Sequence, residues 1–180
     1  DFDDKQGTFA DALDAGDMKR TMNAALVQFF DTEDIEVVPM QRQDRKGWHI
    51  WASVVIDMAP GWSHLCRAIV AAWKKELDGL QLDIADENTF ALGAGNVLED
   101  DIYKESANGS HLSLRPPFVH KNHSLSADTA YVPDNINELV GAGLSDTAIM
   151  RKFIGFAPDG APPTPLTDLG KQSLTASTST

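Results

Sequence analysis

The clearest hydrophobic pattern along the chain lies between residues 60 and 79. Apolar side chains recur there three and four positions apart, which is the spacing of one face of an α-helix. Pro60 stands at the start and Gly79 at the end, as is typical of helix boundaries. The sequence therefore predicts one long helix, with an apolar face made of Trp62, Leu65, Cys66, Ile69, Val70, Trp73 and Leu77.

Alternation of side chains predicts strands on both sides of this helix. Residues 48–57 have two substantially apolar faces, which is typical of a central strand. Residues 35–38 predict a shorter strand, and the polar run 41–47 reads as the hairpin connection between the two. We expect a third strand at residues 80–85 and a short fourth strand at residues 89–92.

Two more helices are expected before the first strand. Thr8 is a suitable N-cap for a short helix that Gly16 would end, and apolar residues recur at helical spacing from Asp17 to Phe30. The order of elements favours an α+β fold, in which a largely antiparallel sheet of three or four strands packs against the long helix.

Beyond this core the periodicity weakens. We expect four parts: an α+β core domain at residues 1–104, an irregular arm at 105–133, a short helical hairpin at 134–156 and a flexible tail at 157–180. An arm and a tail of this kind gain order by wrapping around neighbouring proteins.

Composition excludes some classes of function. Asp and Glu outnumber Lys and Arg by 27 to 15, which gives a formal charge of −12 and works against binding to nucleic-acid phosphates. Uninterrupted apolar stretches are too short for a membrane span. The single cysteine, Cys66, rules out an intrachain disulfide, and its place on the apolar face predicts an inert thiol. We expect a soluble protein of the cytoplasm or of a virion.

One loop resembles a cofactor site. The residues DMAPGW at 57–62 are similar to the glycine loop of S-adenosylmethionine-dependent methyltransferases of the RrmJ/FtsJ type, in which an acidic residue precedes Ala-Pro-Gly. This resemblance implies a small methyltransferase with Gly61 next to the cofactor. The chain has one glycine where that family has two, and Pro60 is also explained as the first residue of a helix.

Histidines in the arm offer a second chemistry. His111, His120 and His123, with Asp128 nearby, are weak candidates for zinc ligands, because imidazole nitrogens and a carboxylate suit zinc. Such a site would make the protein a metal-dependent hydrolase. Their spacing matches no established zinc signature, so surface histidines are the preferred interpretation and no cofactor is expected.

The segment 139–156 has the pattern of a turn and second helix of a helix-turn-helix, which suggests a regulatory protein as a further alternative. Its two basic residues, Arg151 and Lys152, have acidic neighbours, which disfavours contact with DNA.

The preferred hypothesis is a non-enzymatic structural or assembly subunit of a larger complex, with a virion head, neck or tail as one example. We expect it to contact neighbouring protein subunits through the arm, the tail and the aromatic residues Trp51, Phe118 and Tyr131.

Overall fold

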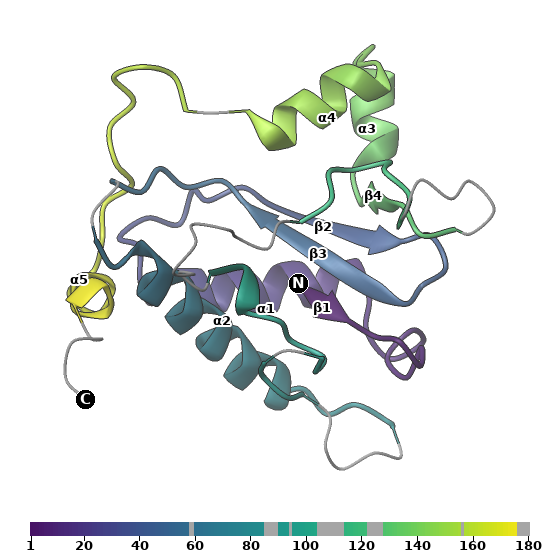
Figure 1. Ribbon diagram of the computed structural model, residues 1–180, viewed down its shortest axis with the longest axis horizontal. Helices are drawn as coiled ribbons and strands as arrows, with labels where there is room; N and C mark the ends of the chain where they lie inside the picture. The colour runs from purple at the N-terminus through teal and green to yellow at the C-terminus, as the bar shows by residue number, and fades with distance from the viewer. Residues whose placement is uncertain are drawn as a thin grey trace.

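The computed structural model describes residues 1–57, 60–84, 90–93, 95–103, 114–121, 128–155 and 157–175. It confirms the α+β fold: an antiparallel sheet of four strands separates helices α1 and α2 from helices α3 and α4 (Figure 1). No helix in these ranges is long and apolar enough to cross a membrane.

The sheet is built around one hairpin. Strands β2 (Val37–Arg42) and β3 (Gly47–Ala52) pair antiparallel, with Val38 opposite Trp51 and Met40 opposite His49. Short strands complete the edges, and the order in the sheet is β1-β3-β2-β4, with β1 at Phe2–Asp3 and β4 at Tyr131–Pro133. The predicted hairpin is confirmed, with a connection shorter than expected because Gln41 and Arg42 belong to β2.

The predicted strand at residues 80–85 is wrong for its described part, residues 80–84, which form no strand. Leu80, Leu82 and Ile84 alternate because they pack as an extended segment against the core. Residue 89 of the expected fourth strand lies outside the described residues, and Leu92 forms a single bridge with Leu98. The alternation of apolar side chains in 80–84 thus reflects burial against the core and not strand pairing. The edge strands of the sheet are formed by segments too short to show an alternating pattern.

Helix α1 (Ala15–Leu26) begins earlier than predicted. Its N-cap is Asp14, whose carboxylate accepts the N–H of Asp17 at 2.8 Å in a capping box, so Gly16 lies inside the helix. The helix expected at residues 8–16 is wrong. Asp4 holds this segment in turns, since its carboxylate oxygens accept the N–H groups of Thr8 and Phe9, both at 2.9 Å.

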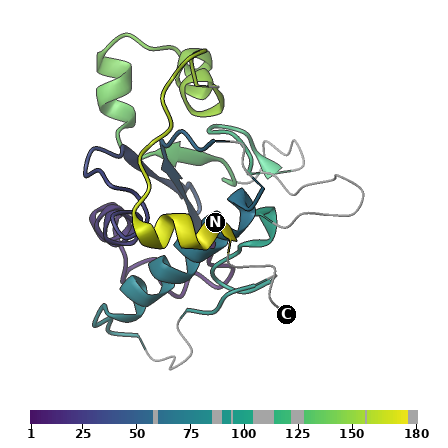
Figure 2. The same ribbon diagram turned by 90° about the vertical axis from the view of Figure 1, so that its left-hand side faces the viewer.

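Helix α2 (Trp62–Asp78) confirms the long helix and packs with α1 beneath the sheet (Figures 1 and 2). Trp73 is the centre of this layer: it is 1% exposed, and its indole N–H donates to Thr21 Oγ1 at 2.9 Å. The ring of Phe2 packs beside it, and Phe9 and Phe90 pack against Phe2, with their own centroids 5.0 Å apart. Large apolar side chains thus fill the inner face of the sheet.

The last part of the chain returns to this body. Residue Thr164 pairs with Val55, donating its N–H to the carbonyl at 2.8 Å, and helix α5 (Asp168–Thr175) lies against α2 (Figure 2). The described part of the segment expected as a flexible tail, residues 157–175 of 157–180, thus contains the helix α5. Gly170 allows this contact, since a Cβ there would lie 2.1 Å from the carbonyl oxygen of Phe29.

The remaining helices are short. A 3-10 turn, η1, covers Asp101–Tyr103, and two short helices, α3 (Ile136–Gly141) and α4 (Asp146–Ile154), lie in the segment 134–156; we call this pair the α3–α4 hairpin. Both views place this hairpin on the side of the sheet opposite α1 and α2 (Figures 1 and 2).

Candidate functional sites

The outer face of the sheet carries the second group of apolar residues. Strand alternation directs Trp48 and Ile50 toward α1 and α2, whereas His49 and Trp51 lie on the opposite face. A small cluster forms there from Val38, Met40, Tyr131, Trp51 and Phe153. We call this side of the sheet the outer face.

A buried histidine is stacked on a tyrosine at the centre of the outer face. The rings of His49 and Tyr131 are nearly parallel, with centroids 3.5 Å apart and an interplanar angle of 10°. His49 is 4% exposed, and its Nδ1 has no hydrogen-bond partner in the part of the chain that the structure describes. Burial, aided by the nearby charges of Arg115 and Arg42, lowers the pKa of His49 to about 3. The imidazole is therefore neutral near pH 7, and its 3.6 Å contact with the Asp1 carboxylate is not an ion pair.

Arg115 lies over the ring of Tyr131 in this stack. Its guanidinium lies 5.4 Å from the Tyr131 ring centroid and donates to the carbonyl oxygens of Val119 and Thr129, at 2.9 and 3.0 Å. Phe118, at a positive φ of 69°, donates its N–H to the Tyr131 carbonyl at 3.0 Å. These contacts hold the described parts of the expected arm against β4.

The three aromatic residues expected to bind partners therefore occupy different environments. Tyr131 is buried within the outer face, and burial is the main cause of its raised pKa, so its side chain holds this layer together. Trp51 and Phe118 are half-buried. Trp51 packs against Phe153 of α4, with ring centroids 5.9 Å apart.

The α3–α4 hairpin stands on this outer face with few described anchors. Phe153 contacts Trp51, and Lys152 Nζ lies 3.3 Å from the carboxylate of Glu36. Ser145 caps α4 by accepting the N–H of Ala148 at 3.2 Å. Leu139 and Ile149 are buried, whereas the exposed apolar side chains are Val140 (55% exposed), Leu144 (37%) and Ile154 (48%). The hairpin thus presents apolar surface to solvent.

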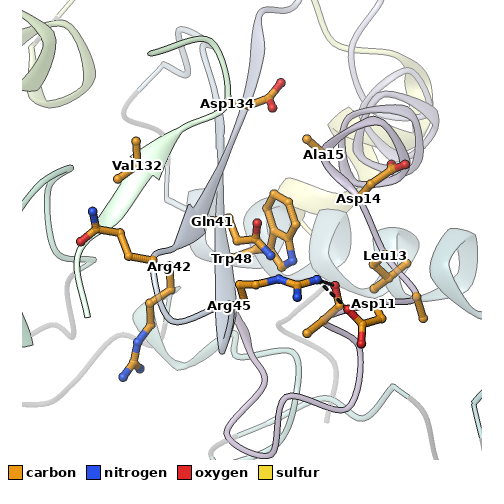
Figure 3. A pocket seen from close by; sticks show the side chains of 13 residues that line it. Asp11, Leu13, Asp14, Ala15, Gln41, Arg42, Arg45, Trp48, Val132 and Asp134 are labelled. Carbon is orange, nitrogen blue, oxygen red and sulfur yellow. Dashed lines mark hydrogen bonds and ion pairs between the residues drawn. The ribbon is translucent and has the colours of Figure 1, made fainter. Parts of the chain in front are cut away.

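A cavity of about 790 Å³ lies at the opposite end of the β2–β3 hairpin (Figure 3). Arg45 occupies the hairpin turn with a positive φ of 62°, and its guanidinium reaches across to the Ala10 carbonyl and to Asp11 Oδ1, the latter at 2.9 Å. We call this cavity the polar pocket. It is lined by Ala10, Asp11, Ala12, Leu13, Asp14, Ala15, Gln41, Arg42, Gln43, Arg45, Trp48, Val132 and Asp134.

Around the polar pocket, the two arginines have acidic partners, whereas two of the carboxylates have no cationic partner in the described structure. Arg45 pairs with Asp11, and Arg42 extends away from the pocket to Asp44, with 3.0 Å between the two groups (Figure 3). In the described part of the chain, the carboxylate of Asp134 has no hydrogen-bond or ion-pair partner. The carboxylate of Asp14 accepts one backbone N–H, that of Asp17 at the start of α1. Among the described residues, Asp14 and Asp134 therefore lack a cationic partner.

The sequence did not indicate this pocket. Its lining comes from three segments, residues 10–15, 41–48 and 132–134, which only the folded sheet brings together. The polar run 41–47 was a visible signal, but it indicated a turn and gave no information about the segments facing it.

The loop that resembles a methyltransferase site is used for packing. Gly61 has a φ of 110°, and a Cβ at this position would lie 1.9 Å from the carbonyl oxygen of Leu174 in α5. The backbone of α5 therefore covers the described part of this loop, while Met58 and Ala59 lie outside the described residues. Nearby, burial raises the pKa of Cys66 to about 11, so the thiol stays protonated at neutral pH, as an inert cysteine should.

The histidine candidates are not brought together by the described structure. His111 and His123 lie outside the described residues, and His120 is half-buried beside the segment that Arg115 holds. Among the residues that are described, no group of three or more His, Cys, Asp and Glu side chains is placed to hold a metal ion.

Comparisons with models of protein families, with curated proteins and with solved structures give no match to this chain.

Proposed function

We propose that this protein is a non-enzymatic assembly subunit that associates through its α3–α4 hairpin, first with further copies of itself. The observation that carries this proposal is the apolar surface that Val140, Leu144 and Ile154 present on a hairpin standing away from the main core. Burying these side chains against a neighbour would remove apolar area from water, which is the main driving force of association.

The attachment of the hairpin supports the same proposal. Its described contacts with the sheet side include an aromatic pair, Trp51 with Phe153, and the exposed ion pair of Lys152 with Glu36. An exposed ion pair contributes little, at about 0–1 kcal/mol. The ion pair therefore contributes little to holding the hairpin, and the exposed apolar side chains stay available to a neighbour.

The geometry supports the helix-turn-helix and methyltransferase interpretations less well. In the helix-turn-helix interpretation, α4 would enter a DNA groove, but Phe153 and Lys152 of α4 contact the sheet side. In the methyltransferase interpretation, Gly61 would face a cofactor, but the Leu174 backbone occupies that space. A virion head, neck or tail stays the sequence-based hypothesis for the kind of complex.

Size-exclusion chromatography with light scattering tests the proposal on the full chain. We expect the mass to rise above that of one chain with increasing protein concentration. The variant Val140→Glu/Leu144→Glu should stay monomeric, whereas Asn137→Glu/Thr147→Glu, which changes exposed polar positions of the same hairpin, should associate like the wild type.

Salt provides a second criterion. Each copy carries a charge of −12, so like-charge repulsion opposes self-association at low ionic strength. We expect added salt to strengthen association, since it screens repulsion and leaves apolar contacts intact. A monomer at every concentration and salt level would show that the proposal is wrong.

A further inference from the structure

The polar pocket combines a few apolar side chains with an excess of negative charge. Trp48, Val132, Leu13 and Ala15 line it with carbon atoms, and Asp14 and Asp134 lie at its edge (Figure 3). A ligand that fits both features has an alkyl stem and a cationic head. Lysine and arginine side chains have this form, because their methylene stems pack on apolar surface while the charge stays near water.

Both arginines at the pocket already have partners, and this indicates the sign of the ligand's charge. Arg45 is held by Asp11 and the Ala10 carbonyl, and Arg42 is held by Asp44 outside the pocket. An anionic ligand would therefore meet paired cations and two carboxylates without a cation. A cationic ligand would meet Asp14 and Asp134 directly, and the overall charge of −12 would attract it from a distance.

From these observations we infer that the polar pocket binds the lysine or arginine side chain of a partner protein. The alkyl stem lies along Trp48 and Val132, and the charged head is placed between Asp14 and Asp134. The side-chain carbonyl of Gln41 supplies a further acceptor in the same lining. This site is separate from the α3–α4 hairpin, and the inference does not depend on self-association.

Nuclear magnetic resonance titration of the full chain tests the inference with four capped amino acids. Nα-acetyl-arginine amide and Nα-acetyl-lysine amide are the cationic probes. Nα-acetyl-norleucine amide has a similar stem without charge, and Nα-acetyl-glutamate amide carries the opposite charge. The signals to follow are the indole N–H of Trp48, the side-chain amide of Gln41 and the backbone N–H of Val132.

We expect the two cationic probes to shift these signals saturably, with a millimolar Kd, and the norleucine and glutamate probes to leave them unchanged. Asp134→Asn should weaken binding of the cationic probes by about fivefold, as loss of one exposed charge pair does. Asp159→Asn removes one exposed carboxylate outside the pocket and should bind like the wild type.

Three results would overturn the inference: no saturable shift with either cationic probe, equal shifts with the norleucine or glutamate probe, or unchanged binding in Asp134→Asn. The effect of salt distinguishes binding at this pocket from self-association through the hairpin. Added salt should weaken binding of the cationic probes, whereas it should strengthen self-association, so each proposal can fail without the other.

Discussion

The two faces of the sheet are covered in different ways. On the inner face, α1 and α2 bury a continuous apolar core in which Trp73 is 1% exposed and its N–H has a partner in Thr21. On the outer face, Trp51 is half-buried, and its indole N–H has no hydrogen-bond partner among the described residues. The α3–α4 hairpin above it exposes apolar side chains. The inner face is therefore tightly packed, whereas the described part of the outer face leaves an indole N–H unpaired and apolar side chains exposed.

Substituting the two tryptophans is the test with the largest expected difference between the two faces. Trp73→Ala should lower the free energy of unfolding by about 3–5 kcal/mol, because it leaves a large cavity and removes the buried hydrogen bond that the indole N–H donates to Thr21 Oγ1. Trp51→Ala should cost only about 1–2 kcal/mol, since its site is already partly open. Chemical denaturation followed by circular dichroism measures both values. Equal losses would mean that the outer face is as tightly packed as the inner one.

The docking of α5 on the inner layer gives a second test. Gly61→Ala should cost about 2–4 kcal/mol, because the new Cβ would collide with the Leu174 carbonyl and would also disfavour the positive φ. Gly160 is the matched control: its φ is 79° and a Cβ there would meet nothing within 4 Å. Gly160→Ala should therefore cost about 1 kcal/mol, from backbone strain alone. If thermal and chemical unfolding gave the same loss for both variants, α5 would not be tightly docked.

Acid should act on the outer face through His49. The folded protein holds this imidazole neutral down to about pH 3, whereas its ordinary pKa is 6.5. Between these values the unfolded state binds more protons, so the free energy of unfolding falls as the pH is lowered. Above pH 6.5 this contribution is constant.

His49→Phe keeps an aromatic ring on Tyr131 and removes the titration. We expect the wild type to lose about 2 kcal/mol more than this variant between pH 6.5 and about pH 4.5. Denaturant melts at the two pH values measure the difference, and titration of carboxylates cancels between the two proteins. Parallel pH profiles would show that His49 is protonated freely in the folded state.

Sequence patterns predicted the long elements well and the edges of the sheet poorly, for physical reasons. Helix α2 and strand β3 are long enough for their apolar spacing to be read directly. The edge strand β1 has two residues and β4 three, too few to show a period, and their pairing is decided by contacts distant in sequence. The extended segment 80–84 shows the converse, because it alternates without pairing.

The candidate sites were even less accessible from sequence. Tyr131 and Trp51 were recognised as aromatic residues of interest, but only the fold distinguishes the buried ring stacked on His49 from the half-buried one beside Phe153. The polar pocket depends on Arg45 reaching Asp11 across 34 positions of sequence, and Asp134 joins them from a third segment. No local pattern encodes such a meeting.

The association surface is tested most directly by hydrogen exchange of the full chain, measured by mass spectrometry at low and high protein concentration. We expect peptides from α2 to be protected at both concentrations, because they lie in the core. Peptides covering residues 136–154 should exchange fast in dilute protein and slow down at high concentration, as their apolar side chains become covered by a neighbouring copy. Exchange in α3 and α4 that is independent of concentration, or as slow as in α2 when dilute, would contradict this account.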